Sequence, residues 1–222
     1  MAVGRLLVPL GLASGGARLR MLRRIARGGY RALASSPLRG VLRTRAVQRL
    51  KKRLVEMPAE LVPEVLAAFE AAGVRAWLAG GWGVDALLGE QTRRHLDLDL
   101  AFDPANDGER RALDALDARG FREVRRESVP TSWLSTRIAL SDDSGHVVDI
   151  HPLPLTGGKV TVAAGGETQT FDEMDAFATG AVAGKRVPCL SRALQLAPRR
   201  GYEQSETDRL DVARLGEAFR SP

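Results

Sequence analysis

The chain has 222 residues, 44% of them hydrophobic and 27% charged, and a net charge of +6. This length accommodates one full catalytic core with about fifty residues left for an extension. The single cysteine, Cys189, excludes an internal disulfide and fits a reducing compartment. We therefore expect a cytoplasmic protein in which this residue is a small buried hydrophobe.

The charges are distributed very unevenly along the chain. Fourteen of the 33 Lys and Arg residues lie at or before Arg53, and the first acidic residue is Glu56. Beyond Arg53 there are 19 basic and 27 acidic residues, so this part has a charge of -8 while the leader has +14. The high isoelectric point therefore describes the leader and not the core.

Residues 1–53 are expected to form a basic N-terminal extension, partly disordered or helical. The apolar run Leu6–Leu12 resembles a weak signal sequence, but it contains Pro9 and is far shorter than the ~20 apolar residues that span a bilayer. Arginines and apolar residues recur at helical spacing over residues 18–27, which would suit weak contact with a membrane surface or nucleic acid. A solvated extension is the interpretation we favour, since Gly28-Gly29 would break such a helix.

The predicted catalytic core covers residues 57–155. Apolar residues at helical spacing predict a helix over Leu61–Phe69. The apolar run Val74–Ala79 predicts a short buried strand, followed by Gly80-Gly81 and a brief helical pattern over Val84–Leu88. A strand, a glycine turn and a helix in this order are typical of a phosphate-binding layout.

The next strand is expected over Asp97–Phe102, where the alternation of acidic and apolar residues places Asp97 and Asp99 on one face. A helix over Gly108–Arg119 follows. Three further strands are then predicted, over 121–126, 133–140 and 146–153. Turn-forming residues between the last two predict a hairpin, and hence antiparallel neighbours.

The segment 156–222 is expected to carry a small helical subdomain, which begins at Ser191. Ser205 and Asp208 approximate a capping box at the start of the last helix. Asp208 and Asp211, one turn apart, are expected on a solvated face. The predicted fold class is therefore α+β, a mixed sheet flanked by helices.

The acidic residues of two strands point to metal chemistry. On one strand, Asp97 and Asp99 would lie about 6 to 7 Å apart, since a strand rises ~3.3 Å per residue. Carboxylates this close repel each other or recruit a cation, and Mg²⁺ prefers one or two carboxylates completed by phosphates and water. Asp149 lies in an apolar strand, so a positive group is expected beside it. His151, on the same face as Asp149, is expected to be structural.

An Asp-x-Asp pair alone is commonly a solvated face of a strand. The glycine turn upstream strengthens the prediction that Asp97 and Asp99 are catalytic. Gly80 and Gly81 would let backbone N–H groups approach a phosphate at a helix N-terminus. Arg93 and Arg94 can add charge-assisted contacts to the same triphosphate. Trp82 either stacks on a base at the mouth of the turn or, as we favour, packs in the core.

Two segments in chain order carry a family resemblance, GGWGVDALLG and then QTRRHLDLDL. They are similar to segments of the aminoglycoside 2''-nucleotidyltransferases and the lincosamide nucleotidyltransferases, members of the polymerase-beta-like superfamily. Three later segments resemble the same group: VVDIHPL, AVAGKRVPCLS and GYEQSETDRLDVARL. The resemblance extends from about Leu61 to Phe219.

This resemblance implies a polymerase-beta-like nucleotidyltransferase sheet and two Mg²⁺ ions. It implies transfer of a nucleoside monophosphate from a nucleoside triphosphate, with ATP favoured, to a hydroxyl of a small molecule such as an aminoglycoside or lincosamide antibiotic. Pyrophosphate would be released, and no nucleic acid would be needed. Asp97 and Asp99 would hold the metals, with Asp149 as third metal-binding carboxylate and general base.

The sequence departs from the family pattern at three places. Trp82 stands where more distant relatives have Ser or Thr, although the antibiotic-modifying members also have Trp. Leu96 stands where many relatives have an additional Asp. Residues 198–200 replace a stretch that often contains a histidine, which leaves the acceptor open. Tyr202 and Glu203 are candidates for lining an acceptor pocket between the sheet and the helical tail.

Two alternative functions remain open. A nucleotidyltransferase that modifies a protein or a metabolite, as antitoxin-type members do, would have the same catalytic residues. A non-catalytic protein that senses nucleotide and docks to nucleic acid or membrane through residues 1–53 belongs to a different class. The complete set of carboxylates argues against the second alternative.

Overall fold

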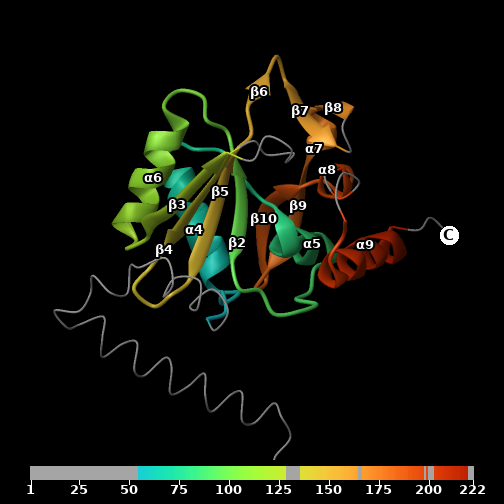
Figure 1. Ribbon diagram of the computed structural model, residues 1–222, viewed down its shortest axis with the longest axis horizontal. Coiled ribbons are helices and arrows are strands. Elements are labelled where there is room, and N and C mark those ends of the chain that lie inside the picture. Colours follow the sequence, from blue (N-terminus) through green and yellow to red (C-terminus); the bar gives the residue numbers. More distant parts are fainter. Residues whose placement is uncertain (1–54, 129–135, 165–166, 198, 200–202, 220–222) are drawn as a thin grey trace, which may run out of the picture.

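The computed structural model describes residues 55–128, 136–164, 167–197, 199 and 203–219 (Figure 1). The basic extension expected over residues 1–53 lies outside the described residues, as do Trp133 and Tyr202. Within the described part of the chain, no helix is both long enough and apolar enough to cross a membrane.

A seven-stranded mixed sheet forms the centre of the molecule, with the strand order β3-β4-β5-β2-β1-β10-β9 (Figure 1). The pairs β2–β5 and β1–β10 are parallel, and the other neighbours are antiparallel. The expected α+β class and the hairpin of β4 and β5 are thereby confirmed. The strands are β1 (Ala76–Leu78), β2 (Leu98–Phe102), β3 (Arg122–Ser128), β4 (Thr136–Ser141), β5 (Val147–Pro152), β9 (Phe177–Val182) and β10 (Lys185–Leu190).

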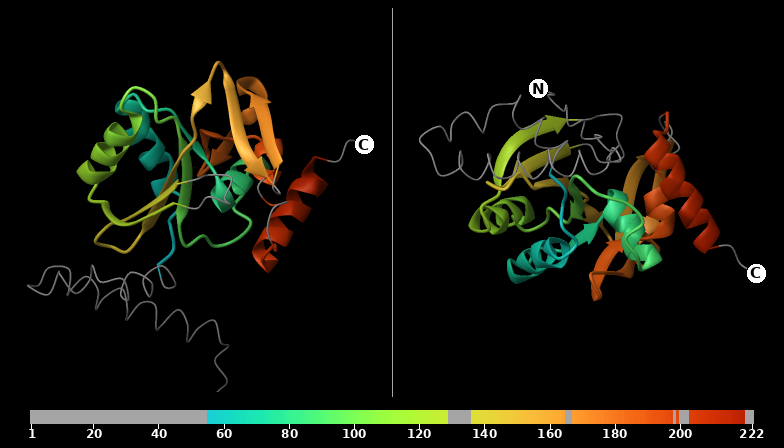
Figure 2. Two further views of the ribbon diagram at one scale, coloured as in Figure 1. Left: turned by 45° about the horizontal axis from the view of Figure 1, so that its top comes forward. Right: turned by 90° about the horizontal axis from the view of Figure 1, so that it is seen from below.

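Helices α4 (Leu61–Ala71) and α6 (Gly108–Ala118) cover one face of this sheet (Figure 2). Phe69 of α4 and Leu116 of α6 are fully buried there, together with the even-numbered residues Leu98, Leu100 and Ile150 of β2 and β5. The apolar residues at helical spacing in the sequence are therefore the ones with which α4 and α6 pack against the sheet in the main core. Burying these side chains contributes about 1.5–3 kcal/mol each relative to exposure.

The opposite face of the sheet carries a second core. A small antiparallel sheet of β6 (Leu155–Thr156), β7 (Lys159–Ala164) and β8 (Glu167–Asp172) lies on this side with α7 (Glu173–Ala176) and α8 (Arg192–Leu196). Trp77 stacks on Phe177 with ring centroids 3.9 Å apart. Trp77 and Ala101 are cross-strand partners, so the odd-numbered residues of β1 and β2 face this side.

The central sheet extends beyond residue 155, where the core was expected to end. Strand β10 pairs in parallel with β1 through Cys189 and Leu78, and β9 completes that edge. Burial raises the pKa of the Cys189 thiol to about 12, which fits the inert hydrophobe expected. The alanine- and glycine-rich strand β9 gives little apolar periodicity, which explains why the sequence did not reveal these strands.

The helices predicted after Ser191 are confirmed. The Ser191 side chain accepts a hydrogen bond from the Leu194 N–H at the start of α8. Helix α9 (Glu206–Ala218) begins with the expected capping box, in which Ser205 and Asp208 bond each other's backbone N–H groups. These two helices form the expected C-terminal helical part, and α9 contacts α5 (Gly80–Leu88).

Gly180 of β9 marks the place where α5 packs closely on the sheet. A Cβ at this position would overlap the backbone carbonyl of Ala86 in α5. The replacement Gly180→Ala is therefore expected to lower the free energy of unfolding by about 1–3 kcal/mol, because the helix must shift. Urea denaturation followed by circular dichroism measures this change.

The matched control is Gly216→Ala within α9, where an added Cβ meets no atom of the described residues within 4 Å. Its free energy of unfolding should stay constant or rise by up to about 1 kcal/mol, since alanine is the better helix former. Equal stabilities of Gly180→Ala and wild type would contradict the close packing of α5 on β9.

Candidate functional site

Two carboxylates meet on neighbouring parallel strands. Asp99 of β2 and Asp149 of β5 are Cα partners, so both side chains lie on the face opposite α4 and α6. Asp97 lies in the bend directly before β2, two residues from Asp99. The Asp99 side chain is 31% exposed, whereas that of Asp149 is 1% exposed. The structure thus places the three predicted acids at one end of one sheet face.

Arg137 of β4 is the positive group expected beside Asp149. Its Nη2 donates a hydrogen bond to Asp149 Oδ2. Burial lowers the pKa of Arg137, but attraction and hydrogen bonding from Asp149, and the charges of Asp99 and Asp97, raise it overall. The three carboxylates therefore act on a single guanidinium, although no sequence motif had singled out Arg137.

His151 lies beside Asp99 on the same face. Its Nδ1 is 3.2 Å from the carbonyl oxygen of Thr136, and its Nε2 is 3.6 Å from Asp99 Oδ1. Because a carbonyl oxygen only accepts, a hydrogen bond to Thr136 uses Nδ1 of His151 as the donor. The histidine is hydrogen-bonded, as expected for a structural residue, and it also contacts a predicted metal ligand.

The glycine turn lies directly against Asp99. Gly80 and Gly81 are the first residues of α5, and the N–H of the preceding Ala79 donates to the carbonyl oxygen of Asp99 at 2.9 Å. Gly80 has a φ of +57°, and a Cβ there would overlap the Asp99 carboxylate. First-turn N–H groups have no partner within their own helix, so an anion-binding helix end borders the carboxylates.

Trp82 packs in the core beneath this turn. Its side chain is 1% exposed, and its ring centroid is 4.4 Å from that of His95. Trp82 therefore packs in the core, as we favoured, and its indole is not exposed at the glycine turn. Gly81 allows this arrangement, because a Cβ there would overlap the His95 ring and the Arg93 guanidinium.

A buried polar network supports the turn from below. His95 Nε2 is 2.5 Å from Asp85 Oδ2, and Thr92 Oγ1 donates to Asp85 Oδ1 at 2.6 Å. His95 is 3% and Asp85 2% exposed. Neither residue was predicted from the sequence, although an acidic residue inside the apolar helical pattern was a usable signal. This network fixes the loop that leads into β2 against α5.

Arg93 and Arg94 have different environments. Arg93 donates from Nε and Nη2 to the two carboxylate oxygens of Asp211, at 3.2 and 3.0 Å. Arg94 instead forms an ion pair with Glu56, and its side chain is 59% exposed. Only Arg93 lies against the glycine turn in this structure.

Asp211 corrects the expectation of a solvated face on α9. Asp211 is 1% exposed. Its Oδ2 lies 3.7 Å from Nη2 of Arg199, and it also forms an ion pair with Arg93. Helical spacing alone could not reveal this, because the two arginines come from distant loops. Asp208, on the same helix, forms the capping box.

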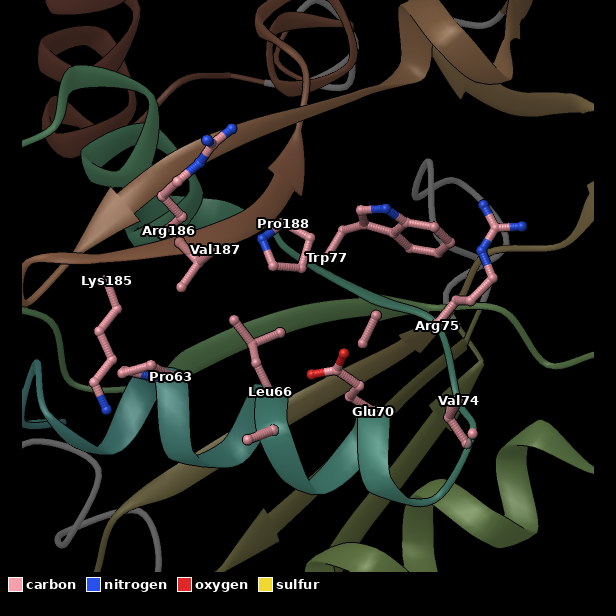
Figure 3. A pocket seen from close by; sticks show the side chains of 13 residues that line it. Pro63, Leu66, Glu70, Val74, Arg75, Trp77, Lys185, Arg186, Val187 and Pro188 are labelled. Atoms are coloured by element: carbon pink, nitrogen blue, oxygen red, sulfur yellow. The ribbon is translucent and has the colours of Figure 1, made fainter.

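A pocket of about 710 Å³ lies at the far end of β1, between α4 and the start of β10. Figure 3 shows Leu66 and Glu70 of α4 on one side of it and Val187 and Pro188 of β10 on the other. None of the three carboxylates lines this pocket, so it is not the expected acceptor pocket beside the helical tail. Glu203, expected to line that pocket, is exposed.

The donor chemistry of the carboxylate cluster fits a divalent metal. Asp99 and Asp149 on neighbouring strands, with Asp97 in the bend before β2, can supply the hard oxygen ligands that Mg²⁺ prefers, and the N-terminus of α5 lies beside Asp99. As the side chains stand, no group of three or more His, Cys, Asp or Glu among the described residues is arranged to hold a metal. The Arg137 guanidinium is held by Asp149 instead.

Comparison with known proteins supports the resemblance seen in the sequence. The family model described as aminoglycoside-2''-adenylyltransferase matches residues 61–215. A lincosamide resistance protein of Staphylococcus haemolyticus is 32% identical over 152 residues, which are 68% of this chain and 89% of that protein. A 2''-aminoglycoside nucleotidyltransferase of Escherichia coli is 42% identical over 65 residues, 29% of this chain and 37% of that protein.

Two solved structures have a similar fold. The lincosamide antibiotic adenylyltransferase LnuA, in its lincomycin-bound crystal structure, is 31% identical with a TM-score of 0.58, and 73% of this chain and 98% of that chain are covered. ANT(2'')-Ia in complex with adenylyl-2''-tobramycin is 18% identical with a TM-score of 0.53, covering 73% of this chain and 89% of that one, and supports the fold alone. From the matched family model and the relative that is 32% identical, the chain belongs to the aminoglycoside-2''-adenylyltransferase family of nucleotidyltransferases.

Proposed function

We propose that this protein transfers a nucleoside monophosphate from a nucleoside triphosphate, with ATP favoured, to a hydroxyl of a lincosamide or aminoglycoside antibiotic. The observation that carries the proposal is the meeting of Asp97, Asp99 and Asp149 beside the N-terminus of α5. An acidic cluster attracts cations, whereas the N-terminus of a helix attracts anions. Their adjacency suits a triphosphate that arrives with divalent cations.

In this proposal Asp97, Asp99 and Asp149 hold the metal, with two Mg²⁺ ions expected. When bound, the metal lowers the pKa of the acceptor hydroxyl and offsets the negative charge of the phosphates. The register of Asp99 with Asp149 supports this assignment, because it aligns one acid from each of two strands. Asp97 adds a third from the bend before β2.

The triphosphate is proposed to bind at the first turn of α5. Gly80 and Gly81 have no side chains, so the Asp99 carboxylate and the positively charged Arg93 guanidinium lie close against the backbone of this turn. Arg94 is exposed on its ion pair with Glu56, so its predicted phosphate contact requires a different side-chain position. Trp82 contributes to this turn through its backbone and through packing on His95.

Asp149 is the proposed general base. The acceptor oxygen attacks the α-phosphorus in line, its proton passes to the Asp149 carboxylate, and the bond from the α-phosphorus to the bridging oxygen breaks. The electron pair of that bond leaves with pyrophosphate. Asp149 is 1% exposed and lies on the same sheet face as Asp99, which supports its assignment as the base beside the metal ligands.

Lincosamides are the first acceptors to test. The lincosamide resistance protein is similar along 89% of its own length, whereas the aminoglycoside enzyme of E. coli is similar along 37%. The longer similarity, together with the crystal structure of the lincomycin-bound LnuA at 31% identity, favours a lincosamide as the acceptor. Modification of a protein or metabolite, and purely non-catalytic nucleotide sensing, receive no support from these relatives.

The test uses purified full-length protein with Mg²⁺, each of the four nucleoside triphosphates, and a panel of lincosamides and aminoglycosides. Mass spectrometry is expected to show one antibiotic gaining the mass of one nucleoside monophosphate, with ATP giving the highest rate. The absence of any nucleotide adduct across the panel would overturn the proposed acceptor class. Release of pyrophosphate provides an independent readout of turnover.

The variants Asp97→Asn and Asp99→Asn test the carboxylate assignment. Each should lower the rate of nucleotide transfer by at least about a hundredfold, because a neutral amide is a poor metal ligand and leaves phosphate charge uncompensated. Thermal melting followed by circular dichroism should show that both variants remain folded.

The matched control is Asp114→Asn on α6, whose carboxylate is 68% exposed and pairs with Arg110. Its transfer rate should equal that of the wild type. Near-normal transfer by either Asp97→Asn or Asp99→Asn would show that the metal site lies elsewhere.

A further inference from the structure

We propose that Arg137 is a built-in counter-cation of the carboxylate cluster, and that a divalent metal binds by displacing its guanidinium from Asp149. This inference rests on the proposed metal site. It adds a regulatory element to that site, because the metal affinity would then be set by an arginine that is not itself a ligand.

The register of the sheet places Arg137 on the carboxylate face. Ala139 of β4 is the Cα partner of Asp149, and Arg137 lies two residues from Ala139, hence on the same face. Its Nη2 donates to Asp149 Oδ2. The guanidinium therefore competes with a metal for the Asp149 carboxylate, because both are cations attracted to the same negative charge.

The charges around Arg137 favour an exchange of cations. Asp97, Asp99 and Asp149 carry three negative charges, and Arg137 supplies one positive charge among them. His151 is 3.6 Å from Asp99 and adds a charge only when it is protonated. A divalent cation carries twice the charge of a guanidinium and takes carboxylate oxygens as ligands, so it can replace Arg137 at Asp149.

The displaced guanidinium has a second acidic partner within reach. Arg137 Nη1 lies 3.9 Å from Glu127 Oε2 on β3, and the Arg137 side chain is 30% exposed. Arginine stays protonated in proteins, so it cannot leave Asp149 by losing its charge. Movement toward Glu127, which also pairs with Arg125, and toward solvent is the route that this inference assigns to the guanidinium.

The ion pair with Arg137 also has a role in stability, because Asp149 is 1% exposed. A buried acid without compensation would be costly, and Arg137 removes that cost while metal is absent. Arg137 thus stabilises the metal-free protein at the expense of metal affinity.

Titration calorimetry of the metal-free protein with Mg²⁺ and with Mn²⁺ tests the inference without any turnover. Arg137→Gln is expected to lower the dissociation constant for either ion roughly tenfold, because the competing charge is gone. The same variant should melt at a lower temperature than wild type without metal, and added Mg²⁺ should raise its melting temperature more than that of wild type.

Arg126→Gln is the matched control, since it removes the same charge from β3, where Arg126 pairs with Glu109 and Glu123. Its metal affinity should equal that of the wild type. A dissociation constant of Arg137→Gln equal to or above the wild-type value would overturn the inference. Loss of metal binding in wild type and Arg137→Gln alike would instead refute the proposed metal site.

A measurement on the wild-type protein covers the case in which Arg137→Gln does not fold. The ¹⁵N resonance of the Arg137 guanidinium, assigned by its absence in Arg137→Lys, should shift as Mg²⁺ is added, following the calorimetric binding curve. A resonance that stays constant while Mg²⁺ binds would show that the guanidinium is not displaced.

Discussion

The parallel pairing of β2 with β5 is the constraint on which the rest of the site depends. It places Asp99 opposite Asp149, although the two residues come from separate segments of the chain. Two acids at this spacing require a neighbouring cation. Arg137 provides one from β4, and α5 begins beside Asp99 with the positive end of its backbone dipole.

The two faces of the central sheet have different tasks. The face under α4 and α6 is a closed apolar core that includes Leu98, Leu100 and Ile150. Because side chains alternate along a strand, Asp99 and Asp149 necessarily lie on the other face. The alternation that places the leucines of β2 in the core therefore also places Asp99 on the face of the carboxylate cluster. A shift of β2 by one residue would turn Asp99 into the core and Leu98 and Leu100 out of it.

Much of this arrangement was predictable where short-range patterns decide it. Helical periodicity predicted α4 and α6, the alternation of acidic and apolar residues predicted β2, and the turn residues predicted the β4–β5 hairpin. Contacts between distant segments left no such pattern. The partners Arg137 and Asp149, Asp85 and His95, and Arg93 and Asp211 each depend on how separate elements pack. Strand β9 was missed because its alanines and glycine give weak periodicity, and β10 because Pro188 is unusual within a strand.

The ion pair of Arg93 with Asp211 joins the loop before β2 to the C-terminal helix. Arg93 lies over the glycine turn, and Asp211 belongs to α9. Breaking this pair would leave the Asp211 carboxylate, which is 2% exposed, without that partner, so separating the two parts carries a cost in free energy. If a ligand bound against α9 changes the affinity of the glycine turn for a second ligand through this pair, the second ligand must change the affinity for the first by the same factor.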